Sequence, residues 1–129
     1  MSYYQQEISR IRKAVFNNQG QIDAVIAIKN FIDSNYENDL NLDLLSKIQL
    51  ISKYHLIRLF KKYYGQTPRQ YLIDTRIRRS KDQLKKGDTV TEVCFAVGFE
   101  SLGSFSSLFK ARTGQTPSQF RKEQLSRSK

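Results

Sequence analysis

The sequence is poor in the residues that usually carry catalysis, metal binding or cross-linking. Its 129 residues include one cysteine and one histidine. Cys94 therefore cannot form an internal disulfide, which is typical of a reducing cytoplasm. His55 has no second histidine with which to build a metal site or a catalytic pair, and no glycine loop of the kind that cradles a nucleotide is present. We expect no enzyme activity, no metal and no cofactor.

Long apolar runs are also missing, and the chain opens with Met-Ser-Tyr-Tyr-Gln-Gln-Glu rather than with a basic and then an apolar segment. These features argue against a membrane span and a secretory signal. Only two prolines and six glycines occur, while 39% of the residues are apolar, so a disordered or fibrous chain is excluded as well. We expect a folded cytoplasmic protein with no membrane partner.

Negative charge is scarce too. Twelve Asp and Glu stand against 22 Lys and Arg, which gives a net charge of +10. So large a positive field favours an anionic partner, and nucleic acid is favoured over a membrane surface, a ribosome or an acidic protein. A basic surface kept only for solubility is the remaining alternative.

One segment of the chain occurs twice. Leu59-Phe60-Lys61 followed by Gly65-Gln66-Thr67-Pro68 recurs, 49 positions later, as Leu108-Phe109-Lys110 followed by Gly114-Gln115-Thr116-Pro117. Two copies are too few for a solenoid, so the repeat indicates a duplicated supersecondary unit. Two similar units predict two similar contacts with the partner.

Capping residues predict where the helices begin and end. Thr67 and Thr116 each precede a proline and stand three positions before a glutamine, which is the pattern of a helix start. Gly65 and Gly114 are placed to end the preceding helices, because glycine adopts the left-handed conformation at low cost. The expected helices cover 4–17, 22–36, 42–48, Ser52 to Gly65, 68–86, 89–97, Ser101 to Gly114 and a stretch after Pro117, with a break at Asn18-Gln19-Gly20.

The helix over 68–86 joins the two copies and is the most basic segment of the chain. At about 1.5 Å per residue it would separate them by roughly 28 Å. Arg76 lies near the packed side of this helix, which favours a structural role. The side chains of Arg78, Arg79 and Lys81 could either contact DNA phosphates or simply be exposed to solvent, and the sequence favours neither alternative.

Other residues with chemical potential have plainer interpretations. Cys94 lies on an apolar helix face, which favours a core residue over a redox or metal switch. For His55 a phosphate contact and simple exposure are both open. Five aromatic residues could stack on the bases of single-stranded nucleic acid, but their helical spacing favours a place in the core. They are Phe60, Tyr71, Phe99, Phe105 and Phe109.

In each copy a short helix is followed, across a turn of three or four residues, by a longer helix, which is the layout of a helix-turn-helix. The second helix of each pair is the candidate recognition helix, because an α-helix fits the major groove of B-DNA while Lys and Arg neutralise phosphates. This spacing alone is only suggestive, since packed helix pairs are common.

The residues of both copies resemble the AraC/XylS transcription regulators. The first copy matches through Leu56-x-Arg58-x-Phe60-Lys61-x-x-x-Gly65, and the second through Val93-Cys94-x-x-Val97-Gly98-Phe99 and Phe105-x-x-x-Phe109-Lys110-x-x-x-Gly114-x-x-Pro117. Tyr71-Leu72-x-x-x-Arg76-Ile77 extends the match into the helix between the copies. The resemblance covers about Ile22 to Lys122.

The resemblance implies an all-α fold with two three-helix, homeodomain-like helix-turn-helix subdomains on a long linker helix. Each subdomain would place one recognition helix in successive major grooves, which lie about 34 Å apart. The implied division of the chain is an N-terminal extension over 1–20, a first subdomain over 21–66, a linker helix over 67–87, a second subdomain over 88–122 and a polar tail over 123–129.

The DNA-binding residues that the resemblance implies fall on both recognition helices. They are Lys53, Tyr54, Ile57, Arg58 and Lys61 in the first, and Leu102, Gly103, Ser104, Ser107 and Lys110 in the second. Arg58 can pair with a guanine, and Lys61 is expected on a phosphate. Ser107 stands where many members carry arginine, so we expect weaker sequence readout from the second helix. Cys94 and Ser80 replace the family's usual alanine as small packing residues.

The sequence therefore predicts a bacterial transcription regulator that binds double-stranded DNA as a monomer, associates with the nucleoid and acts through RNA polymerase. Activation is favoured by the resemblance alone. The chain is either a short regulator that stands alone, which Met1 favours, or the C-terminal part of a longer one. The rival hypothesis is a basic interaction module that binds RNA or an acidic protein.

Overall fold

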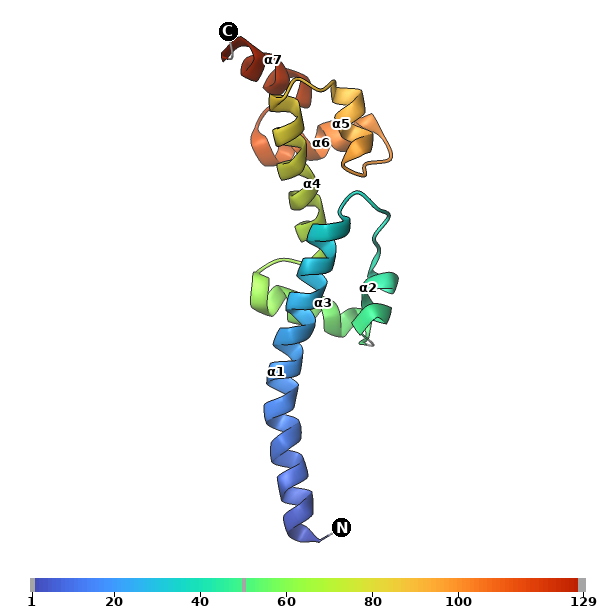
Figure 1. Ribbon diagram of the computed structural model, residues 1–129, viewed down its shortest axis with the longest axis vertical. Helices are drawn as coiled ribbons and strands as arrows, with labels where there is room; N and C mark the ends of the chain where they lie inside the picture. The colour runs from blue at the N-terminus through green and yellow to red at the C-terminus, as the bar shows by residue number, and fades with distance from the viewer. Residues whose placement is uncertain (1, 50, 128–129) are drawn as a thin grey trace. The chain divides into compact units, whose positions relative to one another are not determined.

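The computed structural model describes residues 2–49 and 51–127, without the side chains of residues 7–18, 48 and 49. These residues form α-helices and no strand, which confirms the predicted all-α fold (Figure 1). The helices are α1 (Tyr3–Asn35), α2 (Leu42–Gln49), α3 (Lys53–Tyr64), α4 (Pro68–Lys85), α5 (Val90–Ala96), α6 (Leu102–Thr113) and α7 (Pro117–Arg127).

The helices belong to two compact units. The first unit contains Met1–Phe31 and Leu42–Pro68, and the second contains Ile32–Asn41 and Arg69–Lys129. The end of α1 thus belongs to the same unit as α4 to α7. The subdomain boundaries predicted from the sequence stay a prediction, and each unit is described below by itself.

The predicted helix break at Asn18-Gln19-Gly20 is wrong, because α1 runs without interruption from Tyr3 to Asn35. A glycine inside a helix costs only about 1 kcal/mol relative to alanine, so a single glycine does not by itself end a long helix. The Gln19 side chain donates a hydrogen bond of 2.9 Å to the Asp23 carboxylate one turn later, which supports the helix at this point.

The core of the first unit is formed by apolar residues at helical spacing. On α3 the buried residues are Leu56, Leu59 and Phe60. Val25 and Ile28 of α1 and Leu45 of α2 are also buried. Burial of this side of α3 leaves its opposite side for solvent, which is the condition that a recognition helix must meet.

The core of the second unit contains a row of aromatic rings, and Phe99, Phe105 and Phe109 lie in this core as the sequence predicts. The ring of Phe105 lies 5.2 Å from that of Phe99 and 5.7 Å from that of Phe109, between centroids. Phe120 of α7 continues the row at 5.5 Å from Phe109. Around these rings lie the buried side chains of Ile77 and Leu84 from α4, of Val93 and Cys94 from α5, and of Val97, which directly follows α5.

The duplication seen in the sequence is repeated in the details of α3 and α6. Both helices have 12 residues, and the side chains of Ser52 and Ser101 cap their first turns. Both end at a left-handed glycine, where the amides of Gly65 and Gly114 each donate a 2.8 Å hydrogen bond to a lysine carbonyl. The two helices are therefore equivalent in length and in how they begin and end.

The capping box predicted at the start of α7 is confirmed. The Gln119 amide donates to the Thr116 hydroxyl at 3.1 Å, and the Thr116 amide donates to the side-chain oxygen of Gln119 at 2.9 Å. Pro117 is the first helical residue, where its missing N–H costs nothing.

Candidate nucleic-acid interface

The residues predicted for the first recognition helix share the exposed side of α3. Lys53, Tyr54, Arg58 and Lys61 are exposed, and Ile57 is half-buried. Positions 54, 58 and 61 follow the spacing that puts side chains on one face of a helix. Tyr54 is 84% exposed, although its side chain is largely apolar. An exposed tyrosine between cations offers both hydrogen bonding and apolar contact to a base edge or a sugar.

The residues predicted for the second recognition helix are exposed as well, but they are small or apolar. Leu102, Gly103, Ser104 and Ser107 precede the first cation of α6, Lys110. Apart from the adjacent residues and the backbone of its own helix, a β-carbon added at Gly103 would have no heavy atom within 4 Å, so the helix has open space at this position. The surface of α6 therefore offers hydroxyl and methylene groups where α3 offers charged ones.

The structure shows an ion pair at the first recognition helix that the sequence analysis did not predict. The ammonium of Lys53 lies 2.5 Å from the carboxylate of Asp43, which stands in the first turn of α2. The hydrogen bond to Asp43, and then its negative charge, raise the pKa of Lys53. Lys53 is thus charged and already directed before any ligand is present.

Arg76 has the structural role that its place on α4 favours. Its Nε donates to the carbonyl of Tyr36 at 2.7 Å, and a terminal nitrogen donates to the carbonyl of Asn38 at 2.8 Å. The guanidinium carbon also lies 5.6 Å from the ring centroid of Phe99. Burial lowers the pKa of Arg76, against the opposing effect of nearby carboxylates such as Asp39. These contacts bind the guanidinium to the loop between α1 and α2.

A second arginine, Arg121, holds the loop before α5 through hydrogen bonds to its backbone, and no signal in the sequence predicted this role. Arg121 of α7 donates to the carbonyls of Gly87 and Asp88, both at 2.9 Å. In both copies, then, the helix after the recognition helix carries an arginine that holds the loop before the helix-turn-helix. The two arginines stand at different distances from their prolines, so the 49-residue offset could not reveal the correspondence.

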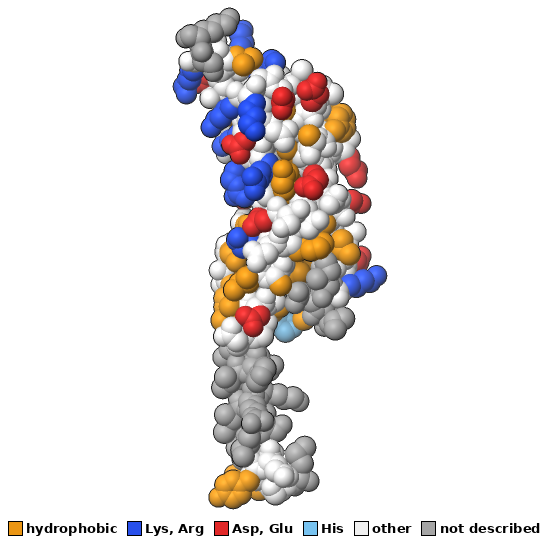
Figure 2. Space-filling view, in the orientation of Figure 1, with side chains coloured by type: hydrophobic (Ala, Val, Ile, Leu, Met, Phe, Trp, Pro, Cys, Tyr) orange, Lys and Arg blue, Asp and Glu red, His pale blue; other side chains and the backbone are white. Residues whose placement is uncertain are grey.

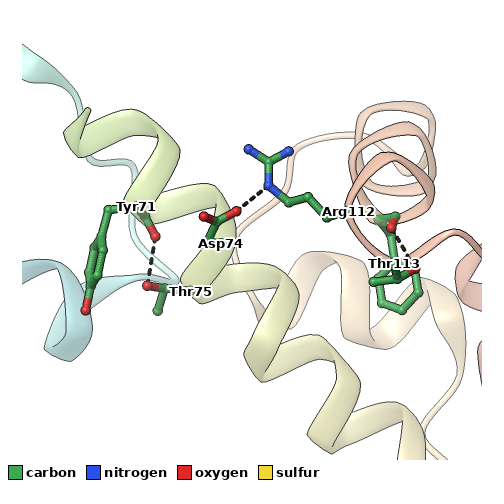
Figure 3. A network of polar contacts seen from close by, with 6 residues as sticks. Tyr71, Asp74, Thr75, Arg112 and Thr113 are labelled. Carbon is green, nitrogen blue, oxygen red and sulfur yellow. Dashed lines mark hydrogen bonds and ion pairs between the residues drawn. The ribbon is translucent and has the colours of Figure 1, made fainter. Parts of the chain in front are cut away.

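The cations of the linker helix are divided between contacts and solvent. Arg79 stacks on Tyr36, with its guanidinium carbon 5.5 Å from the ring centroid, while Arg78 is exposed. Arg112 of α6 forms an ion pair with Asp74 of α4, which Figure 3 shows beside the backbone-bonded hydroxyls of Thr75 and Thr113. In Figure 2, Lys and Arg side chains gather on one side of the second unit.

Cys94 is a core residue, because its side chain is fully buried among the apolar residues of the second unit. Burial raises the pKa of its thiol, so the reactive thiolate is disfavoured. We predict that iodoacetamide labels native protein at neutral pH far more slowly than unfolded protein. Equal labelling rates with and without denaturant would contradict this assignment.

Within the described residues, no three side chains of His, Cys, Asp or Glu come together in a way that could hold a metal ion. In the same part of the chain, none of the helices combines the length and the apolar character that a membrane crossing needs.

Two short helices, each followed across a turn by an exposed 12-residue helix, define a helix-turn-helix protein. In agreement, residues 45–123 match a family model described as a helix-turn-helix domain. The chain belongs to the AraC/XylS family of DNA-binding transcription regulators.

The chain is similar to known transcription regulators. An HTH-type transcriptional regulator of Pseudoalteromonas carrageenovora is 36% identical over 92 residues, which are 71% of this chain and 55% of that protein. The bifunctional transcriptional activator and DNA repair enzyme AdaA of Bacillus subtilis is 36% identical over 95 residues, 73% of this chain and 45% of AdaA. The chain thus spans about half the length of these relatives.

Solved structures share the fold. The C-terminal domain of the two-component response regulator YesN from Fusobacterium nucleatum is 31% identical, with a TM-score of 0.73 over 77% of this chain and 98% of that domain. The DNA-binding domain of the transcription factor AdpA, solved with a target DNA, is 22% identical, with a TM-score of 0.76 over 80% of this chain and 94% of that domain.

Proposed function

We propose that the chain binds a two-part DNA site by placing α3 and α6 in successive major grooves. The observation that carries this proposal is the equivalence of the two helices. Each is a helix of 12 residues that lies between a serine N-cap and a left-handed glycine, and each has an exposed side opposite a buried one. In the AdpA structure, a domain of this fold is bound to its target DNA, which supports the same use here.

The proposed contacts are the exposed residues of both helices. Lys53, Tyr54, Ile57 and Arg58 would provide most of the base readout, with Lys61 on a phosphate. On α6, Leu102, Gly103, Ser104 and Ser107 would contribute apolar and hydroxyl contacts, with Lys110 on a phosphate. The α3 half of the site is therefore expected to show the stronger base preference.

The regulatory role that we propose is activation of transcription through RNA polymerase. Support comes from AdaA, whose name includes a transcriptional activator. Each chain carries both recognition helices, so one copy is sufficient for one two-part site. For this role we propose the division expected from the sequence, with a first subdomain (21–66), a linker helix (67–87) and a second subdomain (88–122).

The test is selection of bound duplexes from a randomised library, followed by titration of the winner against scrambled DNA at about 0.15 M salt. Two preferred half-sites about one helical turn apart would support the proposal. Weak binding without sequence preference would instead favour the basic interaction module, and tighter binding to RNA or to an acidic protein would establish it.

A pair of substitutions on α3 separates base contacts from phosphate contacts. Arg58→Ala is expected to relax the preference at one base pair and to cost about 1–3 kcal/mol on the selected site. Lys61→Ala is expected to weaken all duplexes alike and to lower the salt slope by about 1. Equal losses on selected and scrambled DNA for Arg58→Ala would contradict its assignment to a base.

A further inference from the structure

The ion pair between α2 and α3 lies at the start of the recognition helix, where both partners remain open to a ligand. The side chain of Lys53 is 52% exposed and that of Asp43 is 61% exposed, although their charged atoms are 2.5 Å apart. An exposed pair of this kind adds little to the stability of the fold. Its effect is to restrict the direction of a long side chain that is otherwise free to take many rotamers.

The second copy of the unit offers a comparison inside the same chain. Glu92 in the first turn of α5 corresponds to Asp43, and Leu102 at the start of α6 corresponds to Lys53, each 49 positions later. Both carboxylates interact favourably with the positive end of their helices. That role is common to the two copies, whereas only the first copy has a lysine for the carboxylate to hold.

A carboxylate at this place acts on DNA in two opposite ways. Its negative charge repels the phosphates of every duplex, whatever the sequence. It also fixes Lys53 before binding, which lowers the cost of ordering the side chain on a duplex that presents an acceptor in the right place. The first effect weakens binding to all DNA, and the second strengthens binding only to the matching site.

We propose that Asp43 is a positioning residue for DNA recognition, which directs Lys53 and so raises the preference of the first recognition helix for its matching site over other DNA. This inference rests on the proposed function, in which α3 enters the major groove. It adds to that function a residue of α2, outside the recognition helix, that determines specificity through another side chain.

The experiment compares Asp43→Asn with wild type on the selected duplex and on scrambled DNA. Affinity for the selected duplex is expected to fall about two- to fivefold, as expected for loss of an exposed ion pair. Affinity for scrambled DNA is expected to stay the same or rise, because one negative charge is removed near the phosphates. A shift in opposite directions is a result that simple destabilisation of α2 cannot produce.

Glu92→Gln is the matched control, since it removes the same charge from the same place in the second copy. It is expected to raise both affinities alike and leave their ratio unchanged. Asp43→Glu, which keeps a carboxylate, is expected to restore most of the preference. In a Lys53→Met background, Asp43→Asn is expected to leave the ratio of the affinities for selected and scrambled DNA unchanged, because no lysine remains for the carboxylate to direct. This double variant tests the inference independently of the single Asp43 variants, even if one of them folds poorly.

The outcomes distinguish the two proposals. One outcome is that the wild type prefers the selected duplex while Asp43→Asn leaves the ratio of the two affinities unchanged, and another is that Glu92→Gln changes that ratio equally. Either result overturns the role of Asp43 and leaves the proposed function standing. A wild type that does not distinguish the selected duplex from scrambled DNA overturns the proposed function, and the inference with it.

Discussion

Replacing Phe109 with alanine is expected to lower the free energy of unfolding of the second unit by about 3–5 kcal/mol. Phe109 is 0% exposed and packs between the rings of Phe105 and Phe120. Alanine would leave a cavity at the centre of this row of rings. Chemical denaturation followed by circular dichroism measures the loss, and a decrease of less than 1 kcal/mol would contradict the assignment of Phe109 to the core.

Phe95 provides the control for this substitution, because it is the same residue type in the same unit but is 53% exposed. Phe95→Ala is expected to change stability by less than about 1 kcal/mol, as is usual for surface positions. On DNA, Phe109→Ala is expected to abolish the contribution of the second half-site, so that a scrambled second half-site no longer weakens binding. A variant that still distinguishes this half-site would show that α6 keeps its place without Phe109.

Gly98→Ala is expected to destabilise the second unit by about 3 kcal/mol. Gly98 has a φ of 104°, which costs other residues about 1–2 kcal/mol. An added β-carbon would lie 2.9 Å from the carbonyl oxygen of Glu37 and 3.0 Å from the guanidinium of Arg76. Moving that guanidinium weakens its hydrogen bonds to the loop between α1 and α2, which adds to the loss.

Gly103→Ala is the matched control for this glycine. Gly103 is the second residue of α6 and has open space around it, so alanine is expected to stabilise the helix by less than the ~0.5–1 kcal/mol found in the middle of a helix. Thermal unfolding of both variants tests the pair of expectations. Similar melting temperatures for Gly98→Ala and wild type would show that the loop moves aside without cost.

Local signals in the sequence predicted most of the fold. The caps at Ser52, Ser101 and Thr116 and the left-handed glycines depend on residues within a few positions, and all of them are confirmed. The exception is Gly20, where the local signal for a break was weaker than the tendency of its neighbours to continue the helix. The exposure of the predicted recognition residues also followed from helical spacing.

The contacts that direct individual side chains could not be predicted in this way. Arg76 and Arg112 meet partners about 40 positions away in the chain, the carbonyl of Tyr36 and the carboxylate of Asp74. Lys53 and Asp43 are closer in sequence, but they meet only because α2 and α3 pack against each other. Such pairs depend on how helices pack, for which the spacing of residues along one helix gives no signal.

The open surface of α6 has a consequence for how such a regulator changes its targets during evolution. A β-carbon at Gly103 would meet no atom outside the adjacent residues and the backbone of its own helix within 4 Å, and Ser104 and Ser107 are exposed on the same helix. Larger polar side chains fit at these positions without disturbing Phe105 and Phe109 beneath them. Under the proposed function, new DNA preferences can therefore arise on α6 one substitution at a time, while the contacts of α3 stay unchanged.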